Sequence, residues 1–213
     1  MSTDARYFSQ YGQDRFVFER FFRGVDRGVF LDVGADDGVD KSNTKFFEEL
    51  GWTGLCVEPS PSRFSSLRAN RRAECLNVAI ASRPGEVEFL DMTGWGKGLS
   101  GIVAHYDPRH VERIERETTN NPLTASKTLV RVPAVPLATV LEARGLRHIH
   151  YASIDVEGSE LDVLASIDWT TTTIDVLTVE DNYADAGLQR VLAERGYVVV
   201  AALGQDLVFA KER

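Results

Sequence analysis

The sequence predicts an α/β domain with a mostly parallel sheet that helices cover on both faces. Short apolar runs of strand length alternate along the chain with amphipathic stretches of helical spacing. This alternation is typical of sheets whose parallel strands are joined by helical crossovers. The length of 213 residues suits one hydrophobic core. We therefore expect a single domain over residues 1–213.

The expected elements follow one another in a regular order. Residues 10–22 repeat apolar and aromatic side chains at helical spacing. Ser42 is the expected N-cap of the first helix after the first strand, and Pro61 opens the next helix. The predicted strands are 29–33, 54–58, 75–80, 87–91, 128–135, 148–155, 174–180, 197–203 and 207–211. The predicted helices between them are 42–50, 61–71, 138–144, 159–167 and 187–195.

The segment 91–127 differs from the rest of the chain. It is rich in glycine between residues 94 and 101, and a charged, helix-like run at 110–117 follows Pro108. Long irregular segments in compact domains are usually functional lids or disordered. We predict an irregular insertion that closes over the active site. A surface loop without a function is the alternative.

Composition and charge exclude several classes of partner. Lys and Arg number 24 against 32 Asp and Glu, which gives a formal net charge of −8. This charge argues against binding to nucleic acid or to an anionic membrane. No apolar run approaches the roughly 20 residues that cross a bilayer. The polar start at residues 1–10 predicts no signal peptide, so we expect a cytoplasmic protein. Cys56 and Cys75 lie in apolar stretches and are interpreted as core residues.

A glycine-bearing loop at residues 32–38 is the strongest local signal. It joins an apolar strand to a helix, at the edge of an α/β sheet where ligands bind. It lacks the G-x-G-x-x-G pattern of dinucleotide sites. Its carboxylates would repel a pyrophosphate, whereas they suit the sulfonium and ammonium groups of S-adenosylmethionine (SAM). The residues expected to bind this cofactor are Asp32, Gly34, Ala35, Asp36 and Gly38.

The ends of the next two strands extend this cofactor site. Glu58 is expected to accept hydrogen bonds from both ribose hydroxyls, and Pro59 ends its strand. A solvated charge at the strand end is the alternative for Glu58. Asn77 lies near the end of the third strand, where it can hydrogen-bond the adenine or be an edge residue without a function.

Several further motifs follow the same order along nearly the whole chain. They are SQYGQD at 9–14, SNT at 42–44, GWTG at 51–54, CVEP at 56–59, GLS at 98–100 and DVEGSE at 155–160. Together with the loop at 32–38, this set resembles the FkbM-type methyltransferases. The resemblance implies a class I methyltransferase Rossmann-like fold, with a seven-stranded, mostly parallel sheet and an antiparallel last strand. It also implies SAM as methyl donor and hydroxyl acceptors on sugars or polyketide-type natural products.

The resemblance also assigns a role to the N-terminal part of the chain. It implies that residues 1–27 form a helical lid segment, and that the stretch 10–13 folds over the cofactor. The additional cofactor contacts assigned in this way are Gln10, Tyr11, Gln13, Ser42 and Asp155.

Three carboxylates are expected to converge at the ends of two adjacent strands. Asp155 ends the strand 148–155, and Glu180 and Asp181 end the next one. Oxygen ligands of this kind suit Mg²⁺ or a similar divalent cation, which would lower the pKa of an acceptor hydroxyl. Related sugar O-methyltransferases place a metal at the equivalent strand ends, and the three acids match that pattern. Capping of strands and of nearby helix N-termini is the alternative.

The general base is sought near these strand ends. Glu157 is the first candidate and His105 the second, beside Asp155 in the catalytic set. Some metal-dependent relatives carry a histidine three positions after the aspartate, but Gly158 stands there, so that role is not transferred.

Other polar and aromatic side chains have two interpretations each. His148 and His150 alternate along a strand expected to be buried, which favours a structural role. Trp95 and Tyr106 in the insertion either stack on a sugar face or pack the insertion against the body.

Three functions fit the sequence. The first is O-methylation of a sugar or glycoside hydroxyl, and the resemblance alone points to a partly methylated oligosaccharide such as a mannoside. The second is a non-catalytic module that binds a nucleoside or a protein. The third is an NAD-dependent sugar-modifying enzyme, which the missing third glycine and the acidic loop disfavour. We expect a small-molecule or oligosaccharide acceptor as partner, and either a monomer or a homodimer.

Overall fold

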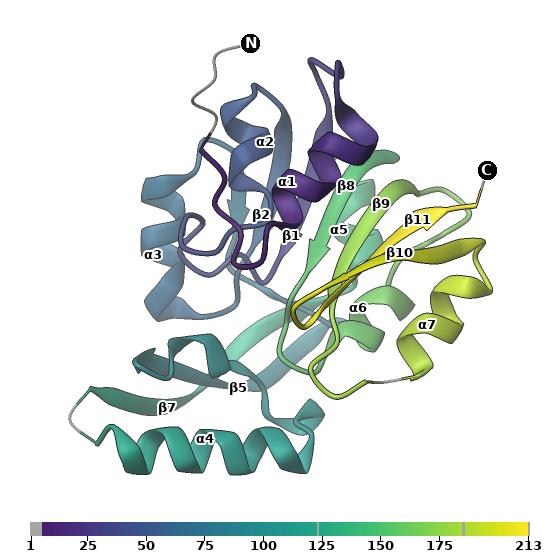
Figure 1. Ribbon diagram of the computed structural model, residues 1–213. Helices are drawn as coiled ribbons and strands as arrows, with labels where there is room; N and C mark the ends of the chain where they lie inside the picture. The colour runs from purple at the N-terminus through teal and green to yellow at the C-terminus, as the bar shows by residue number, and fades with distance from the viewer. Residues whose placement is uncertain (1–5, 123, 185, 213) are drawn as a thin grey trace.

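The computed structural model describes residues 6–122, 124–184 and 186–212 and contains two sheets (Figure 1). Residues 1–5 of the predicted lid segment 1–27 and Leu123 of the predicted insertion lie outside the described residues. The main sheet has seven strands in the order β10-β11-β9-β8-β1-β2-β3. It is parallel except for β11, which pairs antiparallel with β9 and β10. The predicted seven-stranded, mostly parallel sheet is thus confirmed.

The strands of the main sheet are short and mostly buried. They are β1 (Val29–Val33), β2 (Thr53–Val57), β3 (Glu74–Leu76), β8 (His148–Ile154), β9 (Thr173–Glu180), β10 (Tyr197–Leu203) and β11 (Asp206–Lys211). Successive side chains of a strand point to opposite faces, so β1 presents Phe30 to one face of the sheet and Leu31 to the other. This alternation builds two separate hydrophobic layers.

Helices cover both faces of this sheet, as the alternating pattern predicts. One layer contains α1 (Gln13–Val17), a π-helical turn (Phe18–Phe22), α2 (Lys45–Glu49) and α3 (Pro61–Asn70). The opposite layer contains α5 (Leu137–Glu142), α6 (Glu160–Ala165) and α7 (Ala186–Ala193). No helix in the described part of the chain is both long and apolar enough to span a bilayer.

Two boundaries differ from the sequence prediction. The helix predicted from Ser42 begins at Lys45, but the Ser42 hydroxyl accepts a hydrogen bond from the Lys45 amide at 3.1 Å and so still caps that turn. The strand predicted at 75–80 is split at Asn77. The Asn77 side chain donates to the carbonyls of Glu58 and Pro59, and the chain leaves the main sheet there.

The segment 91–127 is more regular than predicted, although the helix-like run at 110–117 does lie within a helix. A second sheet with the order β4-β7-β5-β6 occupies this region, and the long helix α4 (Pro108–Asn120) completes it. Its strands are β4 (Ala79–Ile80), β5 (Gly85–Gly94), β6 (Gly101–Ile102) and β7 (Ala125–Val135). Strands β5 and β7 pair antiparallel without a break from Gly85 to Gly94. The glycine-rich stretch is only the connection between paired strands, and we name this unit, residues 79–135, the hairpin subdomain.

A buried arginine joins the segments around the loop after β1. Arg71 follows α3, and its side chain is inaccessible to solvent. Its guanidinium lies 3.2 Å from Glu48 Oε1 in α2 and 3.5 Å from Asp32 Oδ2 in β1. It also donates to the Gly38 carbonyl at 3.2 Å. Gly38 has a positive φ of 79°, and a Cβ there would come within 2.6 Å of the Arg71 side chain. This glycine is therefore required for packing.

We expect that Arg71→Ala lowers the free energy of unfolding by about 3–5 kcal/mol, because it leaves Asp32 buried without a cation and leaves Glu48 with Lys45 as its one remaining cationic partner among the described residues. Urea unfolding followed by circular dichroism measures this change. Arg71→Lys keeps the charge without the planar fork and is expected to lose less. Equal stability of Arg71→Ala and the natural protein would contradict the role assigned to this network.

Candidate functional site

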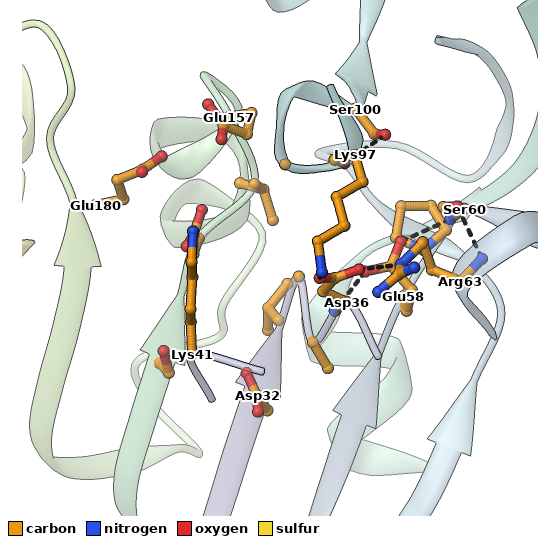
Figure 2. A pocket seen from close by; sticks show the side chains of 18 of the residues that line it. Asp32, Asp36, Lys41, Glu58, Ser60, Arg63, Lys97, Ser100, Glu157 and Glu180 are labelled. Carbon is orange, nitrogen blue, oxygen red and sulfur yellow. Dashed lines mark hydrogen bonds and ion pairs between the residues drawn. The ribbon is translucent and has the colours of Figure 1, made fainter. Parts of the chain in front are cut away.

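A cavity of about 480 Å³ lies at the carboxyl ends of β1, β2, β8 and β9 (Figure 2). Asp32, Asp36 and Glu58 all line it, so the carboxylates singled out in the sequence share one cavity. The other predicted site residues in its wall are Gln10, Tyr11, Gln13, Gly34, Ala35, Ser42, Pro59, Asp155, Glu157 and Glu180. The hairpin subdomain contributes Trp95, Lys97, Leu99, Arg113 and Glu117 to the same wall.

Four predicted site residues are not in this wall. Gly38 packs against α3, as described above. Asn77 commits its amide group to the chain next to Glu58. His105 and Asp181 line a separate cavity of about 430 Å³ between α6, α7 and the start of α4. Proximity to a strand end in the sequence therefore did not suffice to place a side chain in the cavity.

The acids of the loop after β1 already have cationic partners. Asp36 forms an ion pair with Arg63 in α3, and Lys97 of the hairpin subdomain lies 3.8 Å from Asp36. Asp32 accepts a hydrogen bond from the Thr44 hydroxyl at 2.5 Å beside Arg71. The expectation that these loop acids present free negative charge to a cationic ligand is corrected by these pairs. The reason is that α3 brings basic side chains over the loop.

Packing at the end of β1 requires a glycine at position 34. Its φ is 86°, and a Cβ at this position would come within 1.7 Å of the Asp155 carbonyl. Only glycine therefore allows the end of β1 to approach the end of β8 this closely. The Asp155 amide also donates to the Val33 carbonyl at 2.9 Å, which fixes the two strand ends together.

Glu58 is buried at the end of β2 and has no cationic partner within hydrogen-bond distance among the described residues. Its two carboxylate oxygens accept hydrogen bonds from the backbone amides of Asp36, at 2.8 Å, and Ser60, at 2.7 Å. Burial raises the pKa of Glu58 to about 8, and the two amide donors oppose this shift. The backbones of the loops after β1 and β2 thus fix the Glu58 carboxylate at the cavity wall.

A second group of acids lies across the cavity from Glu58 (Figure 2). Carboxylate oxygens of Asp155, Glu157 and Glu180 lie within 4.8 Å of one another, so Glu157 takes the place in this cluster that the sequence assigned to Asp181. Glu180 Oε2 is buried and accepts no hydrogen bond from any described residue. Glu157 has a positive φ of 54° in a turn that Glu160 holds by accepting bonds from two backbone amides.

The close approach of these acids changes their protonation. Asp155 is exposed to the cavity, yet desolvation by the surrounding protein raises its pKa to about 7, and the charges of Asp206 and Glu160 add to this shift. Burial and the charge of Asp155 raise the pKa of both Glu157 and Glu180. Carboxylates this close cannot all be ionised unless a cation is bound among them. The cluster can therefore hold protons or a cation.

A histidine that the sequence did not single out contacts this cluster. His110 in α4 is fully buried, and its Nδ1 lies 3.5 Å from Glu157 Oε2 and 3.2 Å from the Tyr183 hydroxyl. Its Nε2 faces the Leu99 carbonyl at 3.2 Å and so carries a proton. The predicted alternative base, His105, instead has its ring nitrogens near Ser159 and Asp162. The sequence alone did not show which of these two histidines contacts the acidic cluster.

Two residues of a polar lobe of the cavity, Asn43 and Asp206, were not predicted, whereas their neighbour Gln13 was. Gln13 donates to Asp206 Oδ2 at 2.7 Å, and Asn43 donates to the Ser153 hydroxyl at 3.1 Å. Asn43 Oδ1 is buried and has no hydrogen-bond donor among the described residues, although it lies in the cavity wall. The sequence offered only weak signals here, because Asp206 follows a turn and Asn43 precedes a helix.

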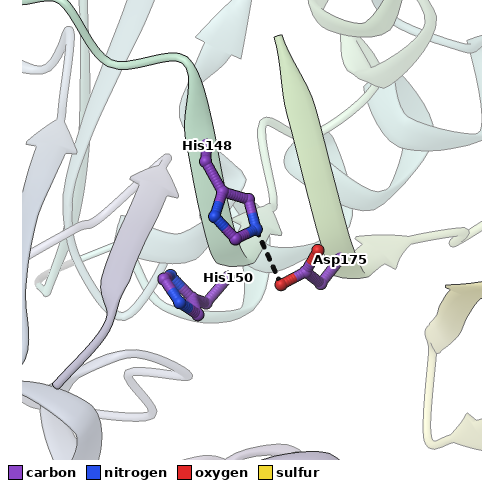
Figure 3. Close-up of side chains that lie close together, drawn as sticks. All are labelled: His148, His150 and Asp175. Carbon is purple, nitrogen blue, oxygen red and sulfur yellow. Dashed lines mark hydrogen bonds and ion pairs between the residues drawn. The ribbon is translucent and has the colours of Figure 1, made fainter.

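His148, His150 and Asp175 form a cluster at the opposite, amino-terminal ends of the strands (Figure 3). His148 is exposed, so the expectation that it is buried was wrong, and its Nε2 lies 2.9 Å from Asp175. The His150 Nδ1 accepts a hydrogen bond from the Val29 amide at 3.1 Å. The proton of this ring therefore stays on Nε2, and His150 cannot bind a metal without losing that bond.

Comparison with known proteins identifies related chains. Residues 32–199 match the family described as the methyltransferase FkbM domain. The chain is 29% identical to the 31-O-demethyl-FK506 methyltransferase FkbM of Streptomyces tacrolimicus, over 93% of this chain and 86% of that protein. It is 28% identical to the 2-O-methyltransferase NoeI of Sinorhizobium fredii (strain NBRC 101917 / NGR234), over 75% of this chain and 65% of that protein. A solved structure of a protein in the NADB-Rossmann superfamily from Streptococcus agalactiae aligns with this chain with a TM-score of 0.48 and 13% sequence identity. The alignment covers 100% of this chain and 72% of that one.

We expect that the melting temperature of the ligand-free protein falls as the pH rises from 5 to 8, in part because of Glu58. Its pKa is raised in the folded state, so the folded protein binds the proton more tightly than the unfolded chain does, and stability is lost as that proton leaves. Differential scanning fluorimetry of the natural protein and of Glu58→Gln measures the contribution. The variant should show a shallower fall, and identical slopes would sink this prediction.

Proposed function

The chain belongs to the FkbM methyltransferase family, and on this premise we propose that it is a SAM-dependent O-methyltransferase acting on a hydroxyl of a sugar or a glycosylated natural product. The observation that carries the proposal is the shared cavity. It joins a fixed carboxylate at the end of β2, a polar lobe and an acidic cluster within one space at the carboxyl ends of the strands. The names of both curated relatives specify methylation of oxygen, which favours a hydroxyl acceptor.

The adenosine part of the donor fits the Glu58 end of the cavity. Glu58 can accept bonds from the two ribose hydroxyls, because each carboxylate oxygen has a further lone pair beside its backbone amide donor. The wall next to it is apolar and suits the flat face of an adenine. It consists of Val78, Ala79, Ile80, Phe89, Leu99 and Ile102.

The methionine part of the donor fits the polar lobe. Its ammonium group has three N–H donors, and the lobe offers the Asp206 carboxylate and the unpartnered Oδ1 of Asn43. Lys41 lines the cavity beside the lobe and can pair with the donor carboxylate. Charged hydrogen bonds of this kind contribute more than neutral ones, so the lobe would set the orientation of the donor.

The sulfonium and the acceptor then meet beside the acidic cluster. Asp155 and Glu157 have no lysine or arginine at hydrogen-bond distance among the described residues, and a bound cation would favour their ionised forms, which suits a positively charged methyl donor. The transfer is an in-line displacement in which the acceptor oxygen forms a bond to the methyl carbon as the carbon–sulfur bond breaks. The chain contributes alignment and exclusion of water. The hairpin subdomain is positioned to exclude water over the cavity.

The same cluster fits a divalent cation. Asp155, Glu157 and Glu180 provide oxygen ligands within reach of one ion, and Glu180 Oε2 lacks any other partner among the described residues. A bound Mg²⁺ would lower the pKa of the acceptor hydroxyl. Asn182 donates to Glu157 Oε2 at 3.2 Å and so holds this carboxylate in the cluster. Glu157 remains the first candidate to receive the hydroxyl proton.

We expect that Asp206→Asn weakens binding of S-adenosylhomocysteine by about tenfold or more, because the ammonium loses a charged acceptor. The same variant should bind 5′-methylthioadenosine as the natural protein does, since that ligand lacks the amino acid part. Isothermal titration calorimetry measures both affinities. Asp175→Asn, at the other end of the strands, is the matched control. An equal loss for both ligands would contradict the placement of the methionine part.

We expect transfer of labelled methyl from SAM to a hydroxyl acceptor that depends on Mg²⁺. The assay uses a panel of sugars, oligosaccharides and glycosylated natural products, with Mg²⁺ or with excess chelator. Chelator should reduce turnover at least about tenfold and added Mg²⁺ should restore it. Asp155→Asn should lose turnover under both conditions. Full turnover in chelator would reject the metal but not the methyl transfer, whereas the absence of SAM binding would reject the proposed function.

A further inference from the structure

One large aromatic side chain stands exposed at the mouth of the cavity. Trp95 follows the end of β5, lines the cavity wall and is 69% exposed. Large apolar side chains usually lie in a core, so an exposed indole at a cavity mouth points to a ligand that covers it. The other tryptophans are not placed in this way, because Trp52 is buried and Trp169 packs against Tyr197.

Trp95 is held in place by two hydrogen bonds, one from its indole and one from its backbone amide. Its Nε1 donates to Glu117 Oε2 at 3.2 Å, and its backbone amide donates to the Thr124 carbonyl at 3.1 Å. The preceding Gly94 has a positive φ of 67°, and a Cβ there would come within 1.4 Å of the same carbonyl. Only glycine permits this close turn. An aromatic ring fixed before the ligand arrives costs less conformational entropy on binding.

Polar groups on one face of α4 extend from this indole toward the acidic cluster. Arg113 and Glu117 are four residues apart in the helix, so they lie on the same face, and both line the cavity. The positive charge of Arg113 acts on Glu157 and lowers the pKa of that carboxyl, against the larger effect of burial. Arg113 thus lines the cavity with the indole, and its charge acts on the acidic cluster.

The second aromatic candidate of the subdomain has a different role. Tyr106 stacks on His110 with ring centroids 4.6 Å apart, and its hydroxyl donates to the Leu99 carbonyl at 3.0 Å. Its ring and its hydroxyl are both occupied by the protein, so Tyr106 packs the subdomain. The Trp95 side chain hydrogen-bonds through Nε1 and is 69% exposed, so much of the indole surface is accessible to a ligand.

We propose that Trp95 is the stacking platform for a pyranoside ring of the acceptor, with Arg113 and Glu117 hydrogen-bonding the ring hydroxyls. This inference rests on the proposed function and specifies the acceptor subsite of the same cavity. A pyranoside combines an apolar C–H face with a rim of hydroxyls, and the subsite combines an indole face with a guanidinium and a carboxylate. The carboxylates of Glu117 and Glu157 disfavour a phosphorylated sugar here.

Tryptophan fluorescence tests this subsite directly. The natural protein is titrated with methyl α-mannopyranoside, methyl α-fucopyranoside and mannobiose, with and without S-adenosylhomocysteine. We expect a blue shift and a change of intensity with at least one of them, because the ring shields the exposed indole. Trp95→Phe should lose this signal. The matched control Trp169→Phe, far from the cavity wall, should keep it.

Affinity and turnover supply the second readout. Trp95→Ala is expected to weaken saccharide binding about tenfold by calorimetry and to raise the acceptor KM by a similar factor, with kcat changed less than about twofold. Trp95→Phe keeps a ring and should recover part of the affinity. S-adenosylhomocysteine affinity should be the same in all three proteins.

Several results would overturn the inference. They are a panel without any fluorescence response, a response that survives in Trp95→Phe, or an unchanged KM in Trp95→Ala. A dimer that dissociates on Trp95→Ala in light scattering, without a saccharide response, would assign the indole to a protein interface instead. Failure of S-adenosylhomocysteine to bind would count against the proposed function alone, because the saccharide titration decides the subsite independently.

Discussion

The ion pairs and hydrogen bonds of the buried Arg71 guanidinium are the interactions on which the loop after β1, beside the cavity, depends. It connects the end of β1, the loop that follows and α2 through Asp32, Gly38 and Glu48. Buried charges are tolerated only when they are paired and hydrogen-bonded, so each of these segments has one permitted position. The loop beside the cavity is therefore shaped by the protein itself. Its acids serve the structure first, and this explains why they are neutralised before any ligand binds.

Acidic residues line both sides of the cavity, but those on one side have cationic partners and those on the other side do not have a lysine or arginine partner at hydrogen-bond distance among the described residues. Asp36 is matched by Arg63, whereas Asp155, Glu157 and Glu180 crowd together across the cavity. Crowding and burial raise the pKa of these carboxyls, and a cationic ligand would reverse that effect. In the proposed function, the electrostatic attraction for a positively charged donor would reside mainly at the ends of β8 and β9. Formal net charge gives no information on this asymmetry.

The hairpin subdomain contacts both the acidic cluster and the loop after β1 in the main domain. His110 in α4 reaches Glu157 and Tyr183, and Lys97 reaches Asp36 and Asp40. These contacts come from both ends of one ordered unit, so a movement of the subdomain would change the two sides of the cavity together. The glycines at 94–101 led to the prediction of an irregular segment. The helix-like run at 110–117 nevertheless predicted the middle of α4, and Asp107 and Pro108 form its start.

The sequence by itself determined the sheet and the edge at which the site lies. Apolar runs fixed the strands, and parallel strands bring their carboxyl ends to one edge, so Glu58 and Asp155 had to meet there. Only the tertiary structure decided which partners those side chains have. Gln13 and Asp206 are 193 residues apart, and neither lies near the other in any local pattern. Charge neutralisation and hydrogen bonding act over a few ångströms in space, and sequence spacing does not encode that distance across separate elements.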